Sequence, residues 1–151
     1  ESFKYKHTPQ NSFQEMMRNG TKILDDHNAS THGKNLINIM DSLPDGGTIK
    51  DLPLHLKPKS GFCNTYSRLW WNKPCTTITR NFGTPSSSRC IHPKVSRALT
   101  TREGARIQTF PDSFKFVGNR SSKNLQIGNA VPPLLSKILA ESIYNHFILA
   151  E

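Results

Sequence analysis

The sequence is short of the features that mark secreted, membrane-spanning and metal-binding proteins. Its three cysteines (Cys63, Cys75 and Cys90) are odd in number and show no Cys-x-x-Cys spacing, so neither a disulfide framework nor a zinc site is predicted. It contains no run of about 18 apolar residues, and no charged-then-apolar leader opens it. We therefore expect a cytoplasmic protein with reduced thiols, no membrane contact and no metal.

Apolar residues are scarce as well. Together with the 9 glycines they make up about 40% of the chain, below the roughly 45–50% of typical globular domains. A modest core can form, as expected if part of the apolar contact surface belongs to another segment. Because the chain begins at Glu1 rather than Met, we expect an excised or cleaved product.

Acidic residues are few, above all in one region. The chain carries 20 Lys and Arg against 11 Asp and Glu, a net charge of +9. Residues 61–110 hold 8 of the basic residues and one acid, Glu103. Such a block is typical of a surface that binds nucleic-acid phosphates. A merely solvated basic face would give the same composition, so charge indicates the sign of the partner and not its identity.

Local patterns predict two helices and two strands in the first half of the chain. A capping-box pattern at Ser12–Glu15, with Ser12 as the cap, opens a short helix. Apolar residues at helical spacing over 36–43 predict a second helix. Thr65–Trp71 and Thr76–Phe82 contain many β-prone residues and flank a turn at 72–74, so they predict strands.

Two further helices are predicted in the second half. A capping-box pattern at Thr100–Glu103 opens a helix that Phe110-Pro111 ends. The last helix is the clearest, because Pro132 and Pro133 stand at its start, where a missing N–H costs nothing. Its apolar face is a stripe at helical spacing: Leu135, Leu139, Ile143 and Phe147, with Ile138 beside it.

Four stretches, in this order, resemble the end of bacterial cytosine-5 DNA methyltransferases: Arg68-Leu69 with Pro74–Thr79, then Ile91–Pro93, Arg97–Phe114 and Gln126–Pro133. In that family they belong to the target-recognition region, the ninth motif and the tenth motif. The string R-x-L-T-x-R-E-x-A-R-x-Q-x-F-P-D followed by G-N-A-V-P-P is highly specific. Gly104 departs slightly from the pattern, since a larger residue such as alanine is usual; it is expected to weaken its helix by about 1 kcal/mol and to change no role.

The resemblance implies a methyl-transfer reaction, and it also shows which catalytic segments of the family are missing from this sequence. Such enzymes rotate a cytosine out of the duplex, add a thiolate to C6 and methylate C5 from S-adenosylmethionine. Their cofactor-binding glycine turn, Pro-Cys-Gln nucleophile loop, Glu-Asn-Val segment and Gln-x-Arg-x-Arg segment are absent from this sequence. Pro74-Cys75 is followed by Thr76 rather than Gln, so Cys75 is expected to be a small, half-buried loop residue. We assign no catalytic residue, and expect the chemistry on an amino-terminal catalytic segment or subunit that partners this one.

By resemblance, this chain supplies recognition of double-stranded DNA. Base edges in the major groove are expected to meet the hydroxyls and methyls of one loop: Thr76, Thr77, Ile78 and Thr79. The same β-branched residues could instead simply build a strand. Phosphates, which take most protein–DNA hydrogen bonds, are expected to meet Arg68, Arg80, Arg89 and Arg97. In the family, arginines such as Arg106 brace the recognition domain against the catalytic domain, so a structural role is expected for Arg106. Arg97 fits either this structural role or a phosphate contact.

The tenth motif implies a cofactor contact. Gly128, Asn129 and Ala130 are expected at the amino end of the last helix, where backbone N–H groups and the helix dipole suit a carboxylate. By resemblance, Asn129 and Ala130 approach the methionine end of S-adenosylmethionine, while the helix packs on the catalytic sheet. The alternative is that Asn129 serves only as a helix cap.

Other classes of nucleic-acid protein fit less well. A zinc-dependent deaminase needs Pro-Cys-x-x-Cys, and the third residue after Cys75 is isoleucine. A single-stranded nucleic-acid binder would use Trp70, Trp71 and Tyr66 as stacking platforms. Adjacent tryptophans on a strand point to opposite faces, so only one of them could stack.

We predict an α+β fold: a small, mixed, strand- and loop-rich recognition domain plus a carboxy-terminal helix that packs on an α/β, Rossmann-like methyltransferase domain. Residues 1–112 form the recognition region with the ninth motif, and residues 113–151 carry the tenth motif and the helix. The predicted function is the DNA-recognition and cofactor-pocket-completing part of a bacterial DNA (cytosine-5-)-methyltransferase, of the kind found in restriction–modification systems. The alternative is a non-catalytic, sequence-specific DNA-binding module, which would have no use for Gly128-Asn129-Ala130.

Overall fold

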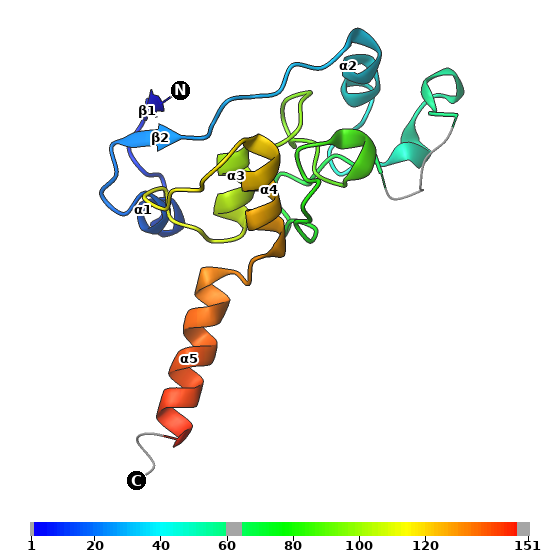
Figure 1. Cartoon of the computed structure of the whole chain (residues 1–151). Coiled ribbons are helices and arrows are strands. Elements are labelled where there is room, and N and C mark those ends of the chain that lie inside the picture. Colours follow the sequence, from blue (N-terminus) through cyan, green and yellow to red (C-terminus); the bar gives the residue numbers. More distant parts are fainter. Residues whose placement is uncertain (1, 60–64, 148–151) are drawn as a thin grey trace.

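The computed structural model describes residues 2–59 and 65–147, so Cys63 lies outside the described residues. Short helices are joined by long loops, and one two-stranded sheet lies near the start of the chain (Figure 1). In that sheet β1 (Ser2–Lys4) pairs antiparallel with β2 (Ile23–Asp25). The predicted small α+β fold with a carboxy-terminal helix is confirmed. Within the described ranges no helix is long and apolar enough to cross a membrane, and no group of His, Cys, Asp and Glu could hold a metal ion.

The predicted helices form, with one change of cap. Helix α1 (Ser12–Arg18) is capped by Asn11, whose side chain accepts a hydrogen bond from the N–H of Gln14 at 2.9 Å, so Ser12 is the first helical residue and not the cap. Helix α2 (Lys34–Asp41) is followed by short 3₁₀ turns at Ile49–Asp51 and Leu54–Leu56. Helix α3 (Thr101–Ile107) has the predicted capping box at Thr100 and Glu103.

The two strands predicted at Thr65–Trp71 and Thr76–Phe82 do not form. The first segment makes one isolated bridge, between Arg68 and Ile91, and its backbone also donates from Arg68 to the carbonyl of Gly47 at 2.8 Å. The second segment is irregular, and a 3₁₀ turn at Pro85–Ser87 follows it. β-branched residues favour strands through packing against neighbouring strands. Here the core buries Thr65 and Ile78 without a partner strand, and Thr76, Thr77 and Thr79 are exposed.

Two apolar clusters form the core. The first consists of Leu69, Ile78, Phe82, Cys90, Leu99, Ala105, Phe110, Phe116 and Ile127. The second consists of Met40, Leu43, Leu52 and Ile91. The first cluster joins residues on both sides of position 112, the predicted boundary between two regions. It also gives Gly104 a role that the sequence did not predict: a Cβ there would lie 2.4 Å from the fully buried ring of Phe82, so the missing side chain makes room for that ring.

The sequence patterns did not predict helix α4 (Arg120–Asn129), which has few apolar residues and so no clear stripe. Asn119 caps it by accepting from the N–H of Ser122 at 2.9 Å. Its buried Asn124 accepts a hydrogen bond from Thr101 of α3 at 2.8 Å, which fixes α4 against α3.

Helix α5 (Pro133–Phe147) follows α4 and extends away from the rest of the chain (Figure 1). Its predicted start at Pro133 is confirmed. The apolar stripe is about half exposed in every member, from 47% at Leu135 to 65% at Phe147. The helix therefore presents its apolar face to solvent in this structure.

Candidate nucleic-acid interface

The loop Thr76–Arg80 has an outer face and an inner anchor. Thr76, Thr77, Thr79 and Arg80 are exposed, whereas Ile78 is 4% exposed and belongs to the first core cluster. Ile78 is therefore an anchor that packs the loop onto the core, and its predicted contact with base edges does not fit this position. The hydroxyls of Thr77 and Thr79 remain available at the surface, and that of Thr76 lies 3.9 Å from the Cys90 sulfur.

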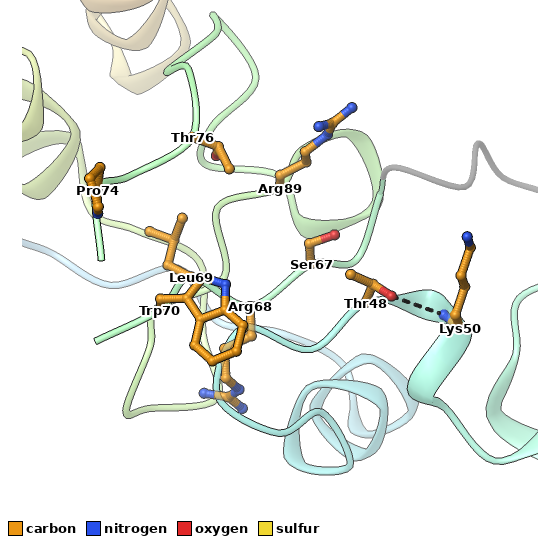
Figure 2. A pocket seen from close by; sticks show the side chains of 10 residues that line it. Thr48, Lys50, Ser67, Arg68, Leu69, Trp70, Pro74, Thr76 and Arg89 are labelled. Carbon is orange, nitrogen blue, oxygen red and sulfur yellow. Dashed lines mark hydrogen bonds between the residues drawn. The ribbon is translucent and has the colours of Figure 1, made fainter. Parts of the chain in front are cut away.

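Two hollows border this loop, and both are lined by Thr76 and Arg89. The first, called the basic hollow here, has a volume of about 330 Å³. Figure 2 shows its lining: Thr48 and Lys50 come from the first 3₁₀ turn, Ser67 and Trp70 from the following segment, and Thr76 and Arg89 from the far side. The second hollow, of about 300 Å³, is lined by hydroxyls and one cation: Thr76, Thr77, Thr79, Ser87, Ser88 and Arg89.

The free cations of this surface are Lys50, Arg80 and Arg89. All three side chains are exposed, and none of them forms a salt bridge or a side-chain hydrogen bond within residues 2–59 and 65–147. Exposed hydroxyls beside unpaired cations are groups that bind phosphate oxygens and base edges. Sequence reasoning missed Lys50, because it lies in a segment whose net charge is close to zero.

Arg68, in contrast, is a buried clamp. It is 8% exposed, and its guanidinium donates to the carbonyls of Met40 at 2.5 Å, Leu43 at 3.0 Å and His92 at 2.8 Å. Two of these carbonyls lie at the carboxy-terminal end of α2, where the helix dipole favours a cation. The two remaining N–H groups donate to the Pro93 carbonyl at 3.4 Å and to the Ser96 hydroxyl at 3.2 Å. All five donors are engaged, so the predicted phosphate contact at Arg68 does not fit the structure.

Arg97 is also engaged within the chain. It forms a two-pronged pair with Glu103, both N–O distances being 2.7 Å, and donates to the carbonyl of Ala98 at 2.9 Å. Burial would raise the pKa of Glu103, but hydrogen bonds from Arg97 and the Thr100 N–H outweigh it and lower that pKa. Of the two roles predicted for Arg97, the geometry favours the structural one.

Arg106 forms a network within the chain, and its expected bracing of one domain against another stays a prediction. Its guanidinium donates to Asp112 at 2.8 and 2.5 Å, and Asp112 is 0% exposed. Tyr5, beside β1, also donates to Asp112, and burial with this contact raises the pKa of Tyr5 to about 12. Burial would raise the pKa of Asp112 as well, yet the hydrogen bonds from Arg106 and Tyr5 lower it. The network joins the start of the chain to the ninth motif.

Cys75 has the features of an inert thiol. It is half-buried, as predicted, and lies against the first core cluster. Its neighbour Cys90 and burial together raise the pKa of the Cys75 thiol, so the thiol is neutral near pH 7. The Cys75 thiol thus lacks the lowered pKa of an activated nucleophile, whereas the contact with Cys75 lowers the pKa of the buried Cys90.

The tenth motif lies elsewhere than expected. Gly128 and Asn129 end α4 and Ala130 follows them, so the motif is a junction between two helices and not the amino end of α5. At that end the prolines have no N–H, and the N–H of Leu134 donates to Thr109 at 3.1 Å. The helix-dipole argument for a carboxylate contact there is therefore wrong.

Gly128 and Asn129 differ in what surrounds them. A Cβ at Gly128 would lie 2.2 Å from the backbone nitrogen of Arg80, so α4 contacts the Thr76–Arg80 loop directly. Asn129 is exposed, and its amide makes no hydrogen bond in the described part of the chain. Asn129 ends α4 and is not adjacent to Pro133, the first residue of α5, so it does not cap the last helix.

The comparisons with known proteins point to one family. The family model described as C-5 cytosine-specific DNA methylase matches residues 1–145. The Type II methyltransferase M.DdeI of Desulfomicrobium norvegicum is 37% identical over 95% of this chain and 38% of its own length. M.BbvI of Brevibacillus brevis is 31% identical over 95% of this chain and 41% of its own length. A solved structure, described as a DNA modification methyltransferase encoded within an E. coli prophage, superposes with a TM-score of 0.72 at 26% identity and covers 99% of this chain and 41% of that chain. This chain thus spans less than half the length of these relatives.

Proposed function

Because the chain belongs to the C-5 cytosine-specific DNA methylase family, we propose that these residues read a specific site in double-stranded DNA for a DNA (cytosine-5-)-methyltransferase. The supporting observation is an exposed set anchored by the core: Thr76, Thr77, Thr79, Arg80 and Arg89. The last four form no side-chain hydrogen bond within residues 2–59 and 65–147, and Thr76 makes a long contact of 3.9 Å from its hydroxyl to the Cys90 sulfur. Hydroxyls on the loop contact base edges in the major groove, and the two arginines contact phosphates.

The tenth motif serves the cofactor in this proposal. The free amide of Asn129 can donate and accept hydrogen bonds, which suits the amino-acid end of S-adenosylmethionine. Gly128 has a different task, because its close contact with Arg80 holds the recognition loop at the same junction. S-adenosylmethionine supplies the methyl group, and Asn129 with Ala130 completes one side of its site.

The target cytosine leaves the duplex and is methylated by groups outside these 151 residues, on a catalytic segment of the same enzyme or a separate subunit. Residues 1–112 act mainly in recognition, and residues 113–151 return the chain to the catalytic domain through α5. Such a protein works on bacterial DNA and hence in the cytoplasm.

The experiment measures the affinity of the complete enzyme for its DNA site over a range of salt concentrations. Arg80→Ala or Arg89→Ala should each reduce the slope of log K against log[salt] by about 0.9, because a protein that neutralises one phosphate fewer releases fewer counterions on binding. Lys137→Ala is the control, since Lys137 lies on α5 next to Glu141 and away from the loop. Unchanged slopes in both arginine variants would contradict the proposed interface.

A non-catalytic DNA-binding module is the alternative, and the exposed amide of Asn129 argues against it. Asn129→Ala should weaken S-adenosylmethionine binding by the complete enzyme while leaving DNA affinity nearly unchanged. If the wild-type protein binds no cofactor, the DNA-binding module becomes the better explanation. If the variant binds the cofactor as the wild type does, the cofactor contact at Asn129 is wrong.

A further inference from the structure

Two adjacent tryptophans lie at the surface beside the basic hollow. Trp70 is 44% exposed and Trp71 61% exposed, and the segment that carries them is not a strand, so no alternation of faces separates them. A lysine ammonium lies over each ring, Lys73 at 3.8 Å from the Trp70 centroid and Lys94 at 5.2 Å from the Trp71 ring. Exposed indoles with cations as neighbours are a surface suited to a flat, anionic ligand.

Trp70 stands between two hollows of different chemistry. The basic hollow on one side holds Lys50, Arg89 and several hydroxyls (Figure 2). On the other side is an aromatic hollow of about 300 Å³, whose lining includes Trp71, Lys73 and Ile107. Cations with hydroxyls bind phosphate, whereas an apolar, aromatic wall binds a planar ring. A nucleotide fits this pair of hollows better than it fits either alone.

The indole of Trp70 is held in place before any ligand arrives. Gly46 has a φ of +69°, and a Cβ there would lie 1.9 Å from Cε2 of Trp70, so the Gly46 backbone packs against the ring. Next to it, the side chain of Asp45 accepts a hydrogen bond from the Trp71 N–H at 3.0 Å. The turn at 45–46 therefore packs against the Trp70 ring and holds the backbone of Trp71, and a fixed indole at Trp70 loses little conformational freedom on binding.

The aromatic hollow cannot itself methylate a base. Cys75 in its lining is a neutral thiol, and Glu103 is held by Arg97. An occupant would thus be bound there and not modified.

We propose that Trp70 stacks on one unpaired nucleobase of the bound DNA, other than the methylated cytosine, with the phosphate of that nucleotide beside Arg89 and Lys50. The inference rests on the proposed function and extends it from the duplex to a base outside the stack. The Lys73 ammonium leaves the ring and turns to a phosphate, because a surface cation–π contact is weaker than stacking of a base on an indole.

The test compares two sets of duplexes that contain the recognition site, using the complete enzyme. In one set a single base near the target cytosine is left unpaired, and in the other the same position is abasic. At one of the positions tested, the wild-type enzyme should bind the duplex with the unpaired base about 10-fold more tightly than the duplex that is abasic there. Trp70→Ala should abolish that difference, and Trp70→Phe should keep most of it. Phe13→Ala, which removes a ring of similar exposure from α1, should not change it.

The outcomes separate this inference from the function on which it rests. If the wild-type enzyme binds its site but shows no preference for the base at any position, the stacking proposal is wrong. It is also wrong if Trp70→Ala weakens both duplexes equally. If the wild-type enzyme does not distinguish its site from unrelated DNA, the proposed function itself fails, and the inference fails with it.

Discussion

Neighbouring side chains in the Thr76–Arg80 loop take opposite roles. Thr77 is exposed, and Ile78 is 4% exposed in the core. Their chemistry is similar enough that sequence alone assigned both to base recognition. Burial separates them, because a side chain packed among Leu69, Phe82 and Ile127 cannot also lie in the major groove.

This difference predicts two kinds of defect. Ile78→Ala should lower the free energy of unfolding by about 2–5 kcal/mol through the cavity it leaves, and preserve the order of preference among DNA sites. Thr77→Ala should leave stability nearly unchanged and shift discrimination at one base pair by about 1–3 kcal/mol. Thermal unfolding and binding to single-base-pair variants of the site provide the measurements. A uniform loss of affinity in Thr77→Ala would assign that residue to holding the loop instead.

The network of Asp112, Arg106 and Tyr5 predicts a dependence on pH. The folded-state pKa of Asp112 lies below its ordinary value of 3.8, so its stabilisation is fully present above pH 3.8 and is lost as pH falls through the folded-state pKa. Asp112→Asn should flatten this acid limb. It should also lower the free energy of unfolding at pH 7 by up to about 3–5 kcal/mol. The loss is smaller to the extent that water still solvates the guanidinium of Arg106, whose side chain is 28% exposed. Denaturant titrations between pH 2 and pH 7, with Glu15→Gln as an exposed control, would detect it. An identical acid limb in Asp112→Asn would exclude the network.

Contacts between elements depend on glycines in this protein. Gly104 makes room for Phe82 between α3 and the core, and Gly128 lets the end of α4 contact Thr79 and Arg80. Both contacts link segments that are far apart in the sequence. Gly128 thus couples the end of α4, where we propose the cofactor contact, to the loop that we propose binds DNA.

Gly128→Ala should disturb both functions at once. The new Cβ would lie 2.2 Å from the Arg80 nitrogen and 2.5 Å from the Thr79 carbonyl carbon, and backbone atoms cannot rotate away as a side chain can. Overpacking of this kind costs about 1–3 kcal/mol, and the displaced loop should bind the DNA site more weakly. Gly33→Ala is the control, since nothing lies within 4 Å of a Cβ there. Wild-type unfolding and DNA affinity in Gly128→Ala would show that α4 and the loop are not coupled.

At the scale of the whole molecule, the apolar face of α5 is only partly covered by the rest of the described chain. The helix projects from the other elements, and its stripe of Leu135, Leu139, Ile143 and Phe147 is about half exposed (Figure 1). Each of these side chains would contribute about 1.5–3 kcal/mol on full burial. We expect this stripe to dock on the catalytic domain.

A polypeptide of residues 1–151 should therefore transfer no methyl groups, and adding the catalytic segment should restore transfer. The measurement is label from methyl-labelled S-adenosylmethionine that reaches C5 of cytosine. A charged substitution in the stripe, Leu139→Glu, should prevent the restoration, whereas Lys137→Glu on the same helix should not. Transfer by residues 1–151 alone would overturn the assignment of Cys75 and the division between the two segments.

The sequence by itself determined the local features. Capping boxes, proline positions and apolar spacing act within a few residues, so α1, α2, α3 and α5 were predictable, as were the family and the positive surface. Helix α4 was not predicted from the sequence, because its Asn119 cap and its contact with α3 stabilise it rather than an apolar stripe.

Only the tertiary structure decided what each arginine does. Arg68, Arg80, Arg89 and Arg97 are alike in sequence, yet two of them are bound by groups of this chain and two are free. The partners of Arg68 are carbonyls of residues 40, 43 and 92, which the fold alone brings together. An arginine can contact DNA only if the fold leaves its donors unpaired, and the pairing of buried donors depends on contacts between distant segments.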